Sequence, residues 1–195
     1  EKEKIAYHES GHAIIGKILQ NADPVHKISI IPRSNGALGF TLQLPLEEKF
    51  LVSKAELLDK LTTLLGGRTA EELVFDEVTT GAQDDFKKAT DISKRMVVEY
   101  GMSDKVGPMN LGQDNGNVFL GEDIVKSREH SEETSSLVDR EIKRIIENCH
   151  QKARRILEKN RSVLDKLAQK IIKVEELEGD QLEEILDEAK APASL

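Results

Sequence analysis

The sequence contains one pattern whose residue types and spacing could do chemistry: His8-Glu9-Ser10-Gly11-His12, an H-E-x-x-H motif. On an α-helix, residues i and i+4 differ by about 40° in azimuth and about 6 Å in rise, so both imidazoles leave the same face. Two neutral imidazoles on one face can bind one Zn²⁺ ion. Glu9 can take a proton from a metal-bound water as that water attacks a carbonyl carbon, and can pass it to the leaving nitrogen. The motif therefore predicts zinc-assisted hydrolysis.

A catalytic zinc ion also needs a third protein ligand and an open position for water. The metzincin extension of the motif requires Gly at position 15 and His at position 18, and Ile15 and Ile18 exclude that class. The downstream acidic candidates are Glu71, Glu72, Asp76, Glu77, Asp84 and Asp85.

Helix geometry ranks two of these candidates. Asp85 shares a helix face with the apolar residues Ala89, Ile92 and Met96, whereas Asp84 shares its face with charged residues. A carboxylate on an apolar face needs a partner, and a cation would serve. Asp85 therefore outranks Asp84 as the third ligand. The alternative reading of Asp85 is a first-turn carboxylate that the helix dipole favours.

The neighbouring pair Glu71 and Glu72 is harder to interpret. Glu72 lies one heptad after Leu65 and near the same helix face. It could pair with Arg68 at i, i+4, as helix-surface residues commonly do, or it could orient a metal-bound imidazole. The sequence leaves both roles open, and Glu72 is the candidate for the orienting role.

The predicted elements around the motif are mostly helical. Residues 3–20 have apolar side chains at helical spacing, followed by two strands at 25–31 and 38–44 that should form a hairpin-like pair. Helical patterns follow from about residue 52, with an interruption at Gly66-Gly67, and from about 80 to Gly101. After a loop over 102–121 with a candidate strand at 118–120, helical tracts run from about 131 to 160, from 163 to 174, and from a capping box at Asp180 to about 190. The fold class is thus mainly α, with a small sheet beside the zinc helix.

The second strand is a candidate for substrate binding. Proteases commonly bind extended peptides by adding a strand to a sheet edge, and Gly39 would allow a close backbone approach. Gly39, Phe40 and Thr41 are therefore the candidate contacts. The alternative is an ordinary hairpin strand that covers the zinc helix.

Composition excludes several classes of protein. The 195 residues include 28 Lys and Arg against 36 Asp and Glu, and the net charge of −8 argues against nucleic-acid binding, which needs a concentrated basic surface. No apolar run approaches the roughly 20 residues that span a bilayer, and no signal peptide is visible. The single cysteine, Cys149, cannot form an internal disulfide.

Four blocks in order resemble the protease domain of the FtsH family, the membrane-anchored, ATP-dependent AAA zinc metalloproteases of peptidase family M41. These blocks are Tyr7 to Ala13, Leu65 to Glu72, Thr80 to Phe86 and Tyr100 to Ser103; the 25–44 stretch and Phe119-Leu120-Gly121 are also similar. The family usually has Ala where this chain has Ser10, a change between small residues.

The resemblance implies more than the spacing does. It assigns the metal ligands as His8, His12 and Asp85, with one Zn²⁺ per chain, and Glu9 as the general base. It also implies a peptidase domain over 1–190, with a zinc-site subregion at 1–121, a helical subregion at 122–190 and a flexible tail at 191–195. The chain is then a soluble fragment of a protein whose upstream AAA ATPase domain uses ATP and whose membrane anchor is also absent here.

In that family the domain assembles as a hexameric ring beneath an ATPase ring and degrades unfolded or damaged proteins. We therefore expect polypeptide substrates, a homo-hexamer, and a location on the cytoplasmic side of the inner membrane. Two alternatives use the same residues: a non-catalytic helical assembly module with a structural metal, and a zinc hydrolase that acts on a non-peptide amide.

Overall fold

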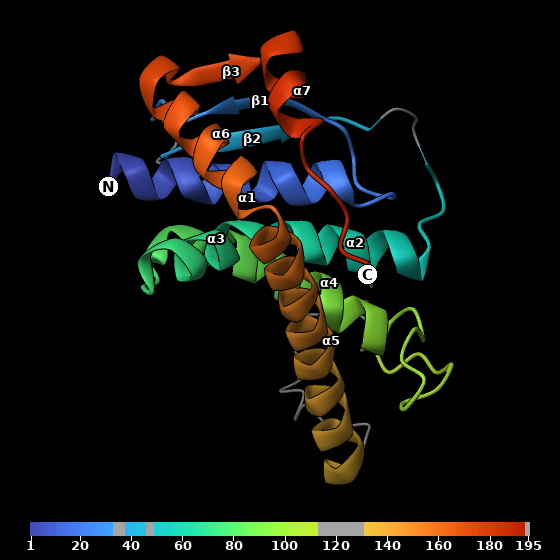
Figure 1. Cartoon of the computed structure of the whole chain (residues 1–195). Coiled ribbons are helices and arrows are strands. Elements are labelled where there is room, and N and C mark those ends of the chain that lie inside the picture. Colours follow the sequence, from blue (N-terminus) through green and yellow to red (C-terminus); the bar gives the residue numbers. More distant parts are fainter. Residues whose placement is uncertain (33–37, 46–48, 113–130, 194–195) are drawn as a thin grey trace, which may run out of the picture.

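The computed structural model describes residues 1–32, 38–45, 49–112 and 131–193 of the chain (Figure 1). The elements, in order, are α1 (Lys2–Ile18), β1 (Val25–Ser29), β2 (Phe40–Gln43), α2 (Lys54–Leu64), α3 (Gly66–Phe75), the 3₁₀ helix η1 (Thr80–Ala82), α4 (Gln83–Val98), α5 (Glu132–Lys159), α6 (Arg161–Val174), β3 (Glu176–Glu178) and α7 (Asp180–Leu186). The prediction of a mainly α fold with a small sheet is confirmed. None of the helices in the described ranges combines the length and apolar character needed to cross a bilayer.

Helix α1 lies in the middle of the molecule (Figure 1). The sheet with α6 and α7 lies on one side of it, and α2 and α3 lie on the other. Every residue from Ala6 to Gly16 is buried, because neighbours cover the helix all round. Polar residues of the motif are therefore held inside the protein, where their side chains need partners.

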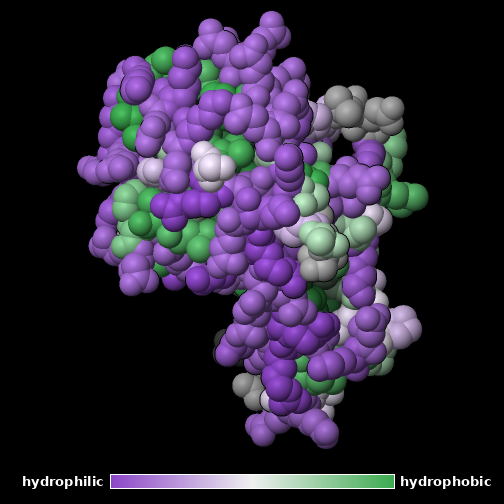
Figure 2. All heavy atoms as spheres, viewed as in Figure 1, coloured by the Kyte–Doolittle hydropathy of each residue, from purple (hydrophilic) through white to green (hydrophobic). Residues whose placement is uncertain are grey.

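Two hydrophobic clusters support this arrangement. The first joins apolar residues of α1, α6, α7 and the sheet, with Ile14, Ile28 and Leu167 fully buried. The second joins α2, α4 and α5 around Leu61 and Met96. Most of the face in Figure 2 is hydrophilic, and hydrophobic atoms appear on it in small separate groups.

The break between α2 and α3 falls where the two glycines interrupt the pattern. Helix α2 begins with a capping box, in which the Ser53 hydroxyl accepts from the Glu56 backbone N–H and the Glu56 carboxylate accepts from the Ser53 N–H. Leu65 separates the two helices, and Asp76, in a left-handed conformation, ends α3. Helix α3 thereby packs along α1 as an independent segment.

The three-stranded antiparallel sheet has the order β2-β1-β3, so β2 is an outer strand among the described residues. The β1–β2 pairing that the sequence predicts is confirmed, with Ile28 opposite Thr41. Strand β3 was not predicted, because it is three residues long and only Leu177 in it is apolar and buried. The residues directly before and after it, Glu175 and Gly179, both have positive backbone φ angles.

The end of the chain differs from the prediction in one further way. The expected capping box at Asp180 does not form: Gly179 is the N-cap of α7, no side chain caps the helix, and α7 ends at Leu186. Helix α4 ends at Val98, three residues before the predicted stop at Gly101. The candidate strand at 118–120 and the 121/122 subregion boundary lie outside the described residues.

Candidate metal centre

Glycines let α1 and α3 approach closely enough to enclose the motif. A Cβ atom built on Gly11 would lie 2.4 Å from the carbonyl oxygen of Gly66 and 2.8 Å from the Cβ of Ala70. Position 11 therefore cannot hold a residue with a side chain unless α1 and α3 move apart. His8, Glu9 and His12 therefore lie in a buried layer, each less than 10% exposed.

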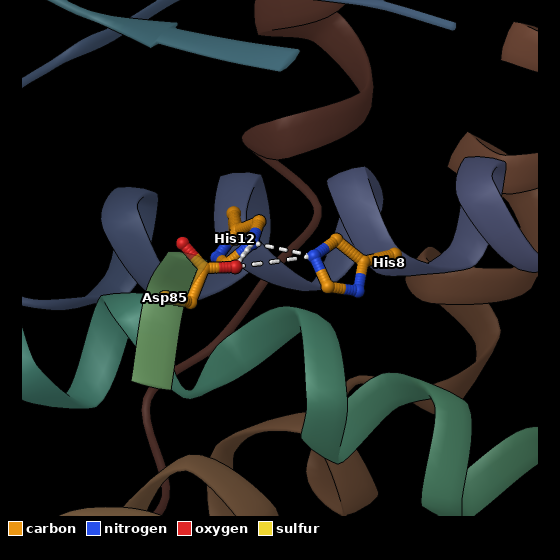
Figure 3. Close-up of side chains that lie close together, drawn as sticks. All are labelled: His8, His12 and Asp85. Atoms are coloured by element: carbon orange, nitrogen blue, oxygen red, sulfur yellow. Dashed lines mark hydrogen bonds and ion pairs between the residues drawn. The ribbon is translucent and has the colours of Figure 1, made fainter. Parts of the chain in front are cut away.

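The structure brings His8, His12 and Asp85 together, although Asp85 is 73 residues beyond His12 (Figure 3). The two Nε2 atoms are 3.1 Å apart, and the Oδ2 atom of Asp85 lies 3.3 Å from each of them. Zinc bonds of 2.0–2.2 Å in a tetrahedral arrangement place ligand atoms about 3.3–3.6 Å apart. The three side chains thus have the chemistry and the spacing of a zinc site.

Hydrogen bonds on the far side of each imidazole determine its tautomer. His12 Nδ1 lies 2.7 Å from the carbonyl oxygen of Thr63, which can only accept, so Nδ1 carries the proton. His8 Nδ1 lies 2.7 Å from Oε1 of Glu71 and donates to that carboxylate. Both Nε2 atoms then face one another and the Asp85 carboxylate, an arrangement that needs a cation between them, either a proton on one ring or a metal ion.

The electrostatics of these groups support the same conclusion. Burial lowers the pKa of His8, but hydrogen bonds to Asp85 and Glu71 outweigh burial and raise it to about 9. Burial raises the pKa of Asp85, yet hydrogen bonds to His12 and His8 hold it well below its ordinary value. Both shifts mean that a positive charge is favoured among these three side chains.

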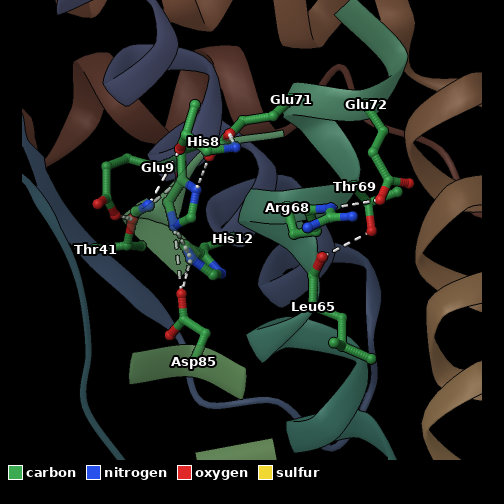
Figure 4. A network of polar contacts seen from close by, with 12 residues as sticks. His8, Glu9, His12, Thr41, Leu65, Arg68, Thr69, Glu71, Glu72 and Asp85 are labelled. Atoms are coloured by element: carbon green, nitrogen blue, oxygen red, sulfur yellow. Dashed lines mark hydrogen bonds and ion pairs between the residues drawn. The ribbon is translucent and has the colours of Figure 1, made fainter. Parts of the chain in front are cut away.

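Glu71, rather than Glu72, contacts the histidine (Figure 4). Glu71 is 2% exposed, and while Oε1 accepts from His8, Oε2 accepts from the Thr79 backbone N–H at 3.0 Å. One carboxylate therefore ties His8 to the segment that leads into η1 and α4, which carries Asp85. Glu71 is therefore placed to orient the His8 imidazole, the role for which the sequence offered Glu72.

The candidate Glu72 lies on a different side of α3. Successive helical residues are rotated by about 100°, so only one member of the pair can face α1. The Glu72 carboxylate pairs instead with Arg68 on its own helix and with Nε2 of His150 on α5 at 3.0 Å. The contact with Arg68 is the i, i+4 pair that the sequence offered as one alternative for Glu72, whereas the carboxylate that contacts His8 is that of Glu71.

Asp85 and Asp84 differ as their helix faces predict. Both lie in the first turn of α4, but Asp84 is exposed while the side chain of Asp85 is 17% exposed and points to the histidines. The Thr79 hydroxyl caps the turn before them by accepting from the Gly81 N–H at 3.1 Å. This cap holds the start of η1 and α4, and thereby positions the Asp85 carboxylate.

Gly67 is a site residue that sequence reasoning missed. A Cβ atom at this position would lie 2.4 Å from Nε2 of His8 and 2.5 Å from the ring carbons Cδ2 and Cε1. The bare backbone of Gly67 therefore forms a wall of the pocket that holds the imidazole. The signal in the sequence was the Gly66-Gly67 pair, which reads only as a helix interruption when the partner helix is unknown.

Glu9 faces the open side of the centre, where β2 crosses α1. The Thr41 hydroxyl lies 2.7 Å from Oε2 of Glu9 and 3.1 Å from its carbonyl oxygen. The histidines, Glu9, Asp85 and the residues of β2 together line a cleft of about 1780 Å³. Gly39 packs against the helix, since a Cβ there would lie 2.8 Å from Cγ2 of Ile5.

Comparison with known proteins gives a consistent result. The family model described as peptidase family M41 matches residues 1–185. The chain is 54% identical, over its full length, to the ATP-dependent zinc metalloprotease FtsH of Endomicrobium trichonymphae, of which it covers 31%. It is 50% identical over 96% of its length to the FtsH of Thermotoga maritima, and 46% identical over 98% to that of Bacillus subtilis, covering 31% and 30% of those proteins. The chain thus spans about a third of the length of these relatives.

Proposed function

The chain belongs to peptidase family M41, and on this premise we propose that it is the zinc-dependent endopeptidase part of a longer ATP-dependent protease. The observation that carries the proposal is the convergence of the His8, His12 and Asp85 ligand atoms at 3.1–3.3 Å beside Glu9. Similarity to the family alone would not require this chain to keep a complete metal centre. The spacing of the three side chains supports the proposal because it brings together all the protein ligands that a catalytic zinc ion needs.

Each side chain then has a defined task. His8, His12 and Asp85 would hold a Zn²⁺ ion, which would lower the pKa of a bound water and polarise the substrate carbonyl. Glu9 accepts the proton as the water attacks, and then gives it to the leaving nitrogen. Glu71 and the Thr63 carbonyl hold the two imidazoles in the tautomer that presents Nε2.

A polypeptide substrate suits the shape of the site. The outer strand β2 lines the cleft, and an extended peptide can pair with the outer edge of a sheet. Gly39, Phe40 and Thr41 lie on this strand or directly before it. In this proposal Phe40 and its neighbours hold the peptide, while the glycine serves contact with α1.

The wider setting follows from the family resemblance. We expect unfolded or damaged proteins as substrates, delivered by an AAA ATPase domain of the same protein, and a hexameric ring of peptidase domains. An anchor elsewhere in the protein would place this domain at the cytoplasmic side of the inner membrane. Residues 1–190 form the peptidase domain in this proposal.

The substitution Glu9→Gln tests the mechanism in the longer protein. The variant should bind zinc as the wild type does and should lose cleavage of an unfolded protein by at least 100-fold, because the base is removed and the ligands remain. Equal cleavage rates with equal zinc content would refute the role of Glu9. Loss of zinc from wild type on chelation, with proteolysis retained, would refute the metal mechanism altogether.

A further inference from the structure

Strand β2 does more than line the cleft, because it rests directly on the residue proposed as general base. A Cβ atom on Gly39 would lie 3.1 Å from Cγ of Glu9 and 3.0 Å from the carbonyl oxygen of Ser29. The strand can lie this close to α1 only because position 39 has no side chain. Two residues later, the Thr41 side chain reaches the Glu9 carboxylate.

The contact between Thr41 and Glu9 is specific to one carboxylate oxygen. A threonine hydroxyl has one proton, and its shorter contact is with Oε2 at 2.7 Å rather than with the Glu9 carbonyl oxygen at 3.1 Å. A hydrogen bond to an ionised acceptor is also the stronger of the two. The hydroxyl therefore donates to Oε2, and Oε1 is the oxygen left to take a proton.

We propose that Thr41 is a positioning residue that holds the Glu9 carboxylate in its proton-accepting orientation, from the same strand whose outer edge receives the substrate. The inference rests on the proposed function, since it assumes that Glu9 is the base. The proton of the attacking water moves to Oε1 and then to the leaving nitrogen, while Thr41 keeps its own proton throughout. In this proposal the same strand, β2, therefore positions both the general base Glu9 and the substrate peptide.

This role differs from that of a substrate contact, which the sequence suggested for Thr41. A residue that only binds the peptide changes KM, whereas a residue that orients the base changes kcat at an unaltered KM. It also differs from a structural role, because the hydroxyl and not the volume of the side chain is needed. Serine at position 41, which keeps the hydroxyl, should therefore preserve kcat. Valine, which has nearly the same shape as threonine but no hydroxyl, should not preserve it.

The test uses the full-length protein with Thr41→Val, Thr41→Ser and, as a matched control, Thr90→Val at an exposed position of α4 outside the cleft. We expect Thr41→Val to lower kcat by about 10- to 100-fold, the range typical of partners that orient a catalytic group, with KM within threefold and zinc content unchanged. Thr41→Ser should recover most of the loss, and Thr90→Val should match wild type. In a Glu9→Gln background, Thr41→Val should cause no further loss.

A kcat within twofold of wild type in Thr41→Val, a change confined to KM, or no recovery with serine would overturn the proposal. A second readout does not depend on activity. In crystals of zinc-free protein, Glu9 should keep one side-chain rotamer in wild type and Thr41→Ser and should adopt others in Thr41→Val. One unchanged rotamer in all three would contradict the positioning role. If the Glu9→Gln variant cleaved substrate as fast as wild type, the proposed function would be refuted. The rotamer measurement would still decide whether Thr41 positions Glu9.

Discussion

Replacing Gly67 with alanine tests whether the backbone of α3 forms the pocket of the first histidine. The added Cβ would lie 2.4 Å from Nε2 of His8 and 2.5 Å from two ring carbons, against the roughly 3.5 Å of an ordinary contact. The imidazole must therefore move by about 1 Å. Zinc bonds tolerate displacements of about 0.2 Å, so the ligand leaves its bonding position. We expect zinc affinity to fall by at least 100-fold.

The fold should survive this substitution. Gly67 has no positive φ and lies within α3, where alanine is favoured over glycine by about 1 kcal/mol. The assay is competitive zinc titration with a chromogenic chelator, with circular dichroism to confirm that the variant is folded. Gly16→Ala is the matched control, because its Cβ would meet the movable amide of Gln43 instead of a ligand. A folded Gly67→Ala protein with wild-type zinc affinity would refute the reasoning.

Three further outcomes follow from buried polar contacts. Ser10 is fully buried and its hydroxyl has no hydrogen-bond partner among the described residues, so Ser10→Ala should raise the free energy of unfolding by up to about 1 kcal/mol in chemical denaturation; a loss of stability would contradict this. Glu71→Gln should weaken zinc binding by about 10- to 100-fold, because His8 loses an anionic partner, and unchanged affinity in a zinc titration would count against that role. A hydrogen bond from Arg144 outweighs burial and lowers the pKa of Glu141 to about 2, so this carboxylate stabilises the fold above its unfolded value of about 4.5 and loses that effect as pH falls toward 2. Glu141→Gln should therefore cost about 1.5–3 kcal/mol at pH 7 and little near pH 2, and an equal cost in unfolding experiments at both pH values would refute the assignment.

Helical periodicity accounts for the part of the centre that could be predicted from the sequence. It places His8 and His12 on one face, and it favours Asp85 over Asp84 because a face shared with Met96 must be buried. These inferences need only the geometry of a single helix. The sequence could also indicate the β1–β2 pair, because alternation over 38–44 is a local property.

The remaining features depend on contacts between distant segments. The choice between Glu71 and Glu72 depends on the rotation of α3 about its axis relative to α1, which no pattern within α3 determines. The role of Gly67 depends on a ring 59 positions earlier in the chain. Strand β3 forms because β1 offers it a partner, and three residues with one apolar side chain give no signal of their own.

The measurement that tests the central claim most directly is the zinc content per chain of purified wild type, Asp85→Ala and Asp84→Ala. Both aspartates lie in the first turn of α4, but only Asp85 contacts the two imidazoles. The account requires about one zinc ion in wild type and in Asp84→Ala, and a marked loss in Asp85→Ala. Full zinc content in Asp85→Ala, or none in reconstituted wild type, would contradict it.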